Sequence, residues 1–383
     1  MLPALYALAA LLLLGLCAEL AARFYLRRFG RYYVWEPHAR TVMPLDPAVF
    51  PRGDALVRFE VNSAGERGAA LPPDLARTYR VLVGGGSAAE CFFLDQPSSW
   101  PEALGRSLST PEHLARLARS SVHVGNVARS LTDCRALVEM FARILPHSPR
   151  ADAIVIMAGA SDLVRWLEEH TPATLSDKPL PTSYLFARHP EGPFGFTPAT
   201  LALRRIAAAL KRTLLRPIER RDTAGKRLAA NRASRANATR ILTSIADPAP
   251  MLAHYEQHLR ELTRLLQRYT PRVVLIRQPW FEKSFSPEEA SQLWMFGDGQ
   301  PYRERVTDYY DRSVIFPIFR QIDAITERVA RELQADSIEL RSRIPADLEH
   351  YYDELHNTPK GCALVGELVA AALLATPAHD TRR

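Results

Sequence analysis

The sequence predicts a doubly wound, three-layer α/β sandwich built on a five-stranded parallel sheet, with a transmembrane helix before it. Two observations support this fold class. Short, almost wholly apolar runs alternate with longer stretches of helical periodicity, as βαβ units require, and a long apolar segment opens the chain. The expected strands are 79–83, 122–126, 153–157, 273–276 and 337–340.

The N-terminal segment is the first element. Residues 2–26 are apolar apart from Glu19 and Arg23, and about 20 apolar residues can span a bilayer. A cleaved signal peptide is the alternative, but no basic region precedes the apolar run and no A-x-A cleavage site follows it. We therefore expect an uncleaved single-pass anchor at residues 1–26. A linker and N-terminal extension are expected at 27–76.

The first strand, 79–83, runs directly into Gly84-Gly85-Gly86-Ser87, and a helical pattern follows. Glycines permit a tight turn and a close backbone approach, so a serine hydroxyl there can face a substrate. Ser87 is therefore a candidate nucleophile, and the backbone N–H groups around Gly86 and Ala88 are candidate donors to a substrate. The alternative is a flexible connection without a chemical role.

The third strand, 153–157, leads into Gly159-Ala160-Ser161-Asp162. In open α/β sheets the loops that follow the strands form the site. We therefore expect Gly159 and Ser161 to lie near Ser87.

A second pair of candidate residues lies near the C-terminus, where Asp353 precedes His356 by three residues. This spacing can bring both side chains to one point, although the same motif also occurs at solvated helix starts. A serine hydroxyl needs a nearby base, and the base needs an acid that fixes its tautomer. Ser87, His356 and Asp353 can supply these three roles.

Helical periodicity accounts for the long stretches between the later strands. The helix at about 250–269 places its leucines on one face, which indicates core packing. The other expected helices are about 314–333 and 362–374.

With these motifs in order, residues 77 to 375 resemble the SGNH (GDSL-type) hydrolase superfamily. Its sequence blocks are a Ser in a Gly-rich turn, a Gly after the second strand, a G-x-N-D loop and a C-terminal D-x-x-H. The resemblance implies a flavodoxin-like sheet in a hydrolase domain at 77–383, with insertions at about 173–250 and 281–310. It also implies that Ser87, His356 and Asp353 are the nucleophile, the base and the acid.

Two positions depart from the family pattern. Ser161 stands where the family has an Asn that donates to the oxyanion, and loss of such a donor typically costs on the order of 100- to 1000-fold in turnover. Ser161 then substitutes imperfectly, or the oxyanion hole depends on backbone N–H groups. The Gly of the second block aligns either with Gly125, beside Asn126, or with Ala128. We nominate Gly125 and Asn126 for this loop.

The resemblance implies a serine esterase that removes an O-acyl group, most plausibly O-acetyl, from an envelope polysaccharide or a lipid. An O-acyltransferase that uses the same triad is one alternative. A non-catalytic, membrane-anchored protein for glycan binding or assembly is another. No metal or organic cofactor is implied.

Positive charge is concentrated in one segment of the chain. Residues 204–240 hold twelve of the 49 Lys and Arg but only two acidic residues, so the remainder is slightly acidic. A basic amphipathic helix suggests contact with anionic lipid headgroups. A solvated lid or linker is an equally good interpretation. Nucleic acid is not an expected partner, because aromatic residues do not interleave with the charge.

Three further features complete the sequence. The second insertion, 281–310, is rich in aromatic residues that either line the mouth of the site or simply pack, and we nominate none of them. Three of the four cysteines lie outside the anchor without metal-type spacing, so free thiols are expected. Arg23, Arg27, Arg28 and Arg31 lie at the C-terminal side of the anchor, which by the positive-inside rule places the main domain in the cytoplasm. Anchored hydrolases of the resembled family act more commonly outside, and we expect the extracytoplasmic side.

Overall fold

The computed structural model describes residues 2–178, 180–214, 218–219, 224–301 and 303–375. Parts of the basic segment 204–240, the aromatic residue Tyr302 and positions 376–383 of the predicted hydrolase domain lie outside the described residues.

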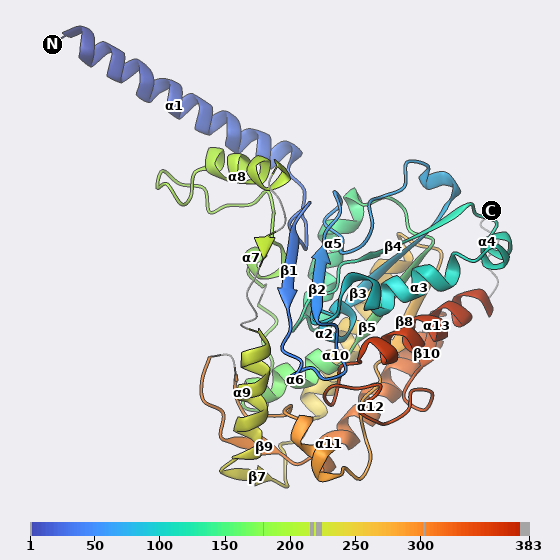
Figure 1. The fold of residues 1–383 in the computed structure, drawn as a ribbon. Coiled ribbons are helices and arrows are strands. Elements are labelled where there is room, and N and C mark those ends of the chain that lie inside the picture. The colour runs from blue at the N-terminus through green and yellow to red at the C-terminus, as the bar shows by residue number, and fades with distance from the viewer. Residues whose placement is uncertain (1, 179, 215–217, 220–223, 302, 376–383) are drawn as a thin grey trace.

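A five-stranded parallel sheet forms the centre of the molecule (Figure 1). Its strands in spatial order are β10 (Asp336–Glu339), β8 (Val273–Arg277), β5 (Ala153–Ala158), β3 (Thr78–Gly85) and β4 (Ser121–Asn126). The predicted fold class and all five expected strands are confirmed. The order is flavodoxin-like, and its topological switch point lies between β3 and β5, where open α/β sheets bind their ligands.

The centre of the sheet is buried on both faces, and this explains why β3, β5 and β8 read as largely apolar runs. Every residue of β5 is buried. Ile154 and Ile156 face one core, whereas Val155 and Met157 face the other.

Helices cover each face of the sheet. On one side pack α5 (Cys134–Ile144), α6 (Ala160–Glu168), α10 (Ala249–Gln267) and α12 (Arg312–Glu332). On the other side pack α3 (Trp100–Leu108), α4 (Pro111–Leu117) and α13 (Pro359–Ala375). Three of these, α10, α12 and α13, match the helices expected from periodicity.

Two elements differ from the sequence-based expectation. The helix after the glycine turn, α2 (Ser87–Glu90), is a single turn that ends at Cys91 in the left-handed region. The segment after β5 is not an open loop, because α6 begins at Ala160 and places Ser161 in its first turn.

The N-terminal extension and the two insertions form small sheets of their own. Strand β1 (Arg40–Pro44) pairs with β2 (Leu56–Glu60) and with β6 (Ile218–Glu219) of the first insertion. Strand β7 (Arg240–Leu242) of the first insertion pairs with β9 (Asp308–Tyr310) of the second. The remaining helices of these segments are α7 (Thr182–Leu185), α8 (Ala202–Leu214), α9 (Ala224–Ala236) and α11 (Pro287–Gln292). Figure 1 shows α9, β7, β9 and α11 gathered at one end of the molecule.

The first helix, α1 (Leu2–Phe29), projects away from this body (Figure 1). In the described part of the chain, it is the one helix long and apolar enough to cross a membrane, a test that a signal sequence also passes. Near its C-terminal end it packs against α8.

Candidate active site

Ser87 is the first residue of α2 and follows β3, a central strand. The turn depends on its glycines. Gly85 has a φ of +148°, which side-chain-bearing residues rarely adopt. A Cβ on Gly86 would lie 2.2 Å from Ser161 Oγ, so Ser161 approaches this closely only because residue 86 is glycine. The two loops that were expected to converge therefore meet at the switch point of the sheet.

Ser87, His356 and Asp353 form a continuous hydrogen-bonded chain. Ser87 Oγ lies 2.7 Å from His356 Nε2, and His356 Nδ1 lies 2.8 Å from each carboxylate oxygen of Asp353. Asp353 Oδ1 also accepts the backbone N–H groups of Leu355 and His356, each at 2.9 Å. With Nδ1–H donating to Asp353, Nε2 is left to accept the serine proton.

Two aromatic residues complete this arrangement. The indole N–H of Trp294 donates to Asp353 Oδ2 at 2.9 Å, and the Tyr352 ring stacks on the His356 ring at 5.4 Å between centroids. Trp294 belongs to the aromatic second insertion, from which we nominated no site residue. The one sequence feature that pointed to Trp294 was the abundance of aromatic residues in this insertion.

The surroundings shift the pKa values of Asp353 and His356 in opposite directions. Burial raises the pKa of Asp353, but the positive charge and hydrogen bond of His356, with the donors Leu355 N–H and Trp294, outweigh it and hold that pKa below its usual range. Burial lowers the pKa of His356, but the Asp353 carboxylate outweighs it and holds that pKa above 6.5. The pair is therefore set to hold a proton on His356 once Ser87 releases one.

Candidate oxyanion donors lie around Ser87. Ala89 and Glu90 donate their N–H groups to Gly86 O, whereas those of Ser87 and Ala88 have no protein acceptor among the described residues. Ser161 lines the same cavity as Ser87. Gly159, with a φ of +104°, caps α6 and thereby aims this first turn at the site.

The structure does not bring Gly125 and Asn126 into the cavity, which corrects their nomination as substrate-binding residues. A Cβ on Gly125 would lie 2.2 Å from Glu66 Oε2, and the Asn126 side chain donates to Ala89 O at 2.8 Å and accepts Ala128 N–H. Both residues are therefore structural. The loop after β4 reaches the cavity later, at Ser130 and Leu131.

A buried arginine supports the nucleophile turn from beneath. The Arg67 guanidinium donates to the backbone carbonyls of Glu90, Cys91 and Leu94, the last two at 2.7 Å. These carbonyls belong to the end of α2 and the residues after it. No sequence motif marks Arg67, because its role exists only when the N-terminal extension packs against this turn.

The triad opens into a cavity of about 350 Å³ that is mainly apolar. Its walls come from the nucleophile turn, the loop after β4, α6, helix α9 of the first insertion, the aromatic stretch of the second insertion and the turn that carries Asp353 and His356. Residues that represent these walls are Phe92, Leu167, Leu228, Trp294 and Phe296. The basic segment therefore contributes a wall of the cavity through α9.

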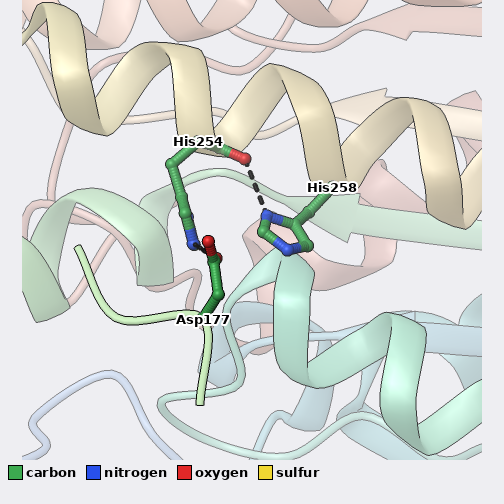
Figure 2. A group of neighbouring side chains, drawn as sticks. All are labelled: Asp177, His254 and His258. Carbon is green, nitrogen blue, oxygen red and sulfur yellow. Dashed lines mark hydrogen bonds and ion pairs between the residues drawn. The ribbon is translucent and has the colours of Figure 1, made fainter. Parts of the chain in front are cut away.

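In the described residues, one group of three side chains could hold a metal ion: Asp177, His254 and His258 (Figure 2). The two histidines lie one turn apart on α10. His254 Nε2 lies 3.2 Å from Asp177 Oδ1, and His258 Nδ1 lies 2.9 Å from His254 O. This ion pair and hydrogen bond already account for the two ring orientations, and none of the three residues lines the Ser87 cavity.

Comparisons with known proteins gave results for structures only. No family model matches the sequence, and no curated protein matches it. The structure is similar to an acetylxylan esterase from Geobacillus stearothermophilus, with a TM-score of 0.40 and 10% identity over 79% of this chain and 97% of that chain. It is also similar to a GDSL-like lipase from Parabacteroides merdae, with a TM-score of 0.41 and 12% identity over 77% of this chain and 95% of that chain. A third similar structure is that of a lipolytic G-D-S-L family member from Veillonella parvula. Its TM-score is 0.40, with 8% identity over 78% of this chain and 99% of that chain.

Proposed function

We propose that this chain is a membrane-anchored serine esterase that cleaves O-acyl esters through a covalent acyl-enzyme. The observation that carries the proposal is the unbroken hydrogen-bonded chain from Ser87 Oγ to His356 at 2.7 Å and on to Asp353 at 2.8 Å, at the edge of an apolar cavity. A buried carboxylate, a histidine in a fixed tautomer and an accessible serine hydroxyl are the parts that nucleophilic acyl transfer requires.

The reaction follows from these positions. Ser87 Oγ attacks the ester carbonyl carbon while its proton passes to His356 Nε2, and the carbonyl oxygen becomes an oxyanion. Collapse of this intermediate breaks the C–O bond to the alcohol, which leaves with the proton from Nε2. Water then attacks the acyl-serine, with His356 again taking and returning a proton. Asp353 remains ionised throughout and stabilises the imidazolium form of His356.

Stabilisation of the oxyanion is assigned to the N–H groups of Ser87 and Ala88, with the Ser161 hydroxyl as a third donor. A hydroxyl has one donor on a shorter side chain than the Asn of the resembled family, but Gly86 allows Ser161 to approach closely. This proximity supports the first of the two alternatives for Ser161, substitution for the family amide.

The cavity bears on the acyl group. The family resemblance suggests an O-acetyl group, yet a mainly apolar space of about 350 Å³ is within the range of sites that hold whole small molecules. We infer that the cavity takes an acyl chain longer than acetyl, carried by an envelope glycan or a lipid, because apolar walls gain stabilisation with each buried methylene.

The test is hydrolysis of p-nitrophenyl esters from acetate to dodecanoate by the full chain in detergent micelles. We expect Ser87→Ala to lower turnover on the order of 10⁴-fold or more, because the nucleophile is gone. Ser109→Ala, a matched change at an exposed serine outside the cavity, should leave turnover unchanged. Ser87-independent hydrolysis would refute the esterase mechanism. If kcat/KM is instead highest with the acetate ester, the result supports an acetyl group as the natural substrate.

Acyl transfer to a sugar hydroxyl is the second candidate. Both insertions line the cavity and can restrict the access of water to the acyl-enzyme. Acyl transfer is distinguished by acyl-Ser87 that accumulates, detectable by intact mass, and is released when a sugar acceptor is added. A protein that only binds glycans would show neither turnover nor acyl-Ser87.

We propose that α1 anchors the enzyme and that the catalytic domain faces the extracytoplasmic side. The length and apolar character of α1 support the anchor. The orientation is supported by the resembled family alone, and the arginines after the span favour the opposite side.

A further inference from the structure

The starting observation is a buried carboxylate in the apolar helix α1. Glu19 is only 2% exposed, whereas most of its neighbours in α1 are open to the surroundings. Its two oxygens accept the backbone N–H groups of Ala202 at 2.8 Å and Leu203 at 3.1 Å, which are the first residues of α8. Glu19 therefore satisfies and charge-stabilises the N-terminus of a helix that lies far away in the sequence.

The loop before α8 docks on the same part of α1. Arg23 bonds to Glu19 at 2.9 Å, donates to Gly195 O at 2.8 Å and lies over the Phe196 ring at 4.5 Å. Arg27 and Arg205 both lie 5.6 Å from the centroid of the Phe194 ring. One face of the C-terminal turns of α1 is thus packed against α8 and the loop before it, while Phe24 and Phe29 remain exposed.

Helix α8 has two apolar faces, and only one of them is occupied. Ala202, which is buried, lies on the same helical face as Ile206 and Ala209, which are partly buried. The second face carries Leu203, Leu210 and Leu214, which are 40%, 62% and 78% exposed. These positions follow helical spacing, so they form one exposed stripe. Arg204 and Lys211 are exposed beside it.

The position of α8 relative to a bilayer follows from the length of α1. Its 28 residues extend about 42 Å at 1.5 Å per residue, whereas the hydrocarbon core is about 30 Å thick. About 20 residues, 2–21, fill that core, so the turns of α1 from Ala22 onward emerge at the headgroup level and Glu19, which caps α8, lies one turn below it. An apolar stripe flanked by Arg and Lys is the composition that binds at that level.

We propose that α8 lies in the membrane interface, with its leucine stripe among the acyl chains and Arg204 and Lys211 at anionic headgroups, and that Glu19 locks it to α1. A retained α1 follows directly, since removal of a signal sequence that includes Glu19 would leave the α8 N-terminus uncapped and the 194–196 loop undocked. This proposal is independent of the esterase chemistry.

The stripe is tested by its depth in the bilayer. The full chain with Cys17→Ser and Leu210→Cys is labelled with an environment-sensitive fluorophore and reconstituted in phosphatidylglycerol/phosphatidylcholine vesicles. We expect a blue-shifted emission that brominated lipids quench and aqueous iodide does not. A label at Leu75→Cys, an exposed leucine before the central sheet, is the control and should show the reverse. Iodide quenching at position 210 equal to that at position 75 would overturn the proposal.

The lock and the lipid charge need separate variants. Glu19→Leu should release α8, so that the label at position 210 becomes accessible to iodide and trypsin cleaves faster at Arg204 and Lys211. Glu112→Gln, at an exposed carboxylate on α4, should change neither. Arg204→Gln with Lys211→Gln should remove any difference in iodide quenching of the position-210 label between anionic and neutral vesicles. If Glu19→Leu leaves position 210 buried, the proposed lock is wrong.

Retention of α1 has its own readout. Intact mass of the membrane-extracted protein should include residues 2–29. A mature chain that begins after Glu19 would refute the retained anchor, whatever the vesicle measurements show.

Discussion

At the scale of single residues, the site combines local motifs with contacts that no motif announces. Ser87 follows a buried strand and a glycine run, and Asp353 and His356 share one short turn, so the sequence alone could nominate all three. Trp294 donates to Asp353 from 59 positions away, and Arg67 reaches Leu94 across 27. Such contacts depend on how distant segments pack, and sequence spacing does not encode that packing.

The pH dependence of turnover follows from the His356–Asp353 pair. His356 must be neutral to accept the Ser87 proton, and its pKa lies above 6.5 because of the Asp353 carboxylate. We therefore expect kcat/KM to rise with pH through a midpoint above 6.5. Stability runs the other way: the raised pKa of His356 contributes stability that is complete below pH 6.5 and is lost as pH rises through the folded pKa. A midpoint at or below 6.5 would exclude His356 as the base in this environment.

Trp294→Phe sharpens this test. The change removes the donor to Asp353 Oδ2, and hydrogen bonds to charged groups contribute about 1.5 to 3 kcal/mol, which corresponds to a loss of about 10- to 100-fold in kcat/KM. The less solvated carboxylate should hold the His356 proton more tightly and move the midpoint to higher pH. Trp280→Phe is the matched control, because its indole bonds to Glu282 outside the cavity.

The contact between Gly86 and Ser161 makes a prediction about coupling. Gly86→Ala should lower the free energy of unfolding by about 1 to 3 kcal/mol, because the new methyl group would lie 2.2 Å from Ser161 Oγ. Ser161→Ala alone should lower turnover about 100-fold with little effect on stability. The double variant should recover most of the stability, since Ser161 Cβ lies 3.5 Å from the new methyl group. Thermal unfolding in micelles measures the stability of each variant. If the stability losses of the two single variants simply add in the double variant, the close contact between residues 86 and 161 is contradicted.

At the scale of elements, β3, β5 and β8 were predictable because burial on both faces leaves apolar runs, whereas the edge strand β10, with one buried residue, was predictable from its place after a long helix. The strands outside the central sheet were not. In β2 buried residues alternate with exposed ones, β1 has a single buried residue, and β6, β7 and β9 are short, with partners in distant segments. The single turn of α2 was also not predictable, because the left-handed conformation at Cys91 depends on its tertiary contacts. The insertions could be located, but their pairing over the cavity could not.

A substitution of Arg232 on α9 tests the role of the two insertions that line the cavity. Its guanidinium donates to the carbonyls of Val49 at 2.6 Å, Gln292 at 3.0 Å and Tyr352 at 3.0 Å, which joins the N-terminal extension, the second insertion and the turn beneath His356. Arg232→Gln should lower the free energy of unfolding by about 3 kcal/mol, because three partly buried carbonyls lose their donor. We expect kcat/KM to fall more for long-chain esters than for acetate. Lys226→Gln, at an exposed position on α9, is the control, and an equal loss with all esters would place the role of Arg232 at His356 instead.

At the scale of the whole molecule, the chain is an α/β domain preceded by one long apolar helix, which we propose holds it at a bilayer. The positive charge beside that bilayer comes from two places, the turns after the span and α8. Only the first is relevant to insertion, because the positive-inside rule counts charges close to the span in the sequence. The described cysteines are free, and three of them are buried, so they fit either compartment.

The orientation is therefore the prediction on which the substrate depends. An envelope substrate requires the catalytic domain outside, so alkaline phosphatase fused after the C-terminus should be active in intact cells, and green fluorescent protein at the same position should be dark. Arg27→Gln with Arg28→Gln and Arg31→Gln should leave both reporters unchanged, because insertion in this orientation does not depend on those charges. A fluorescent fusion that becomes dark when the arginines are removed would show that the positive-inside rule decides, and the substrate would then be a cytoplasmic ester.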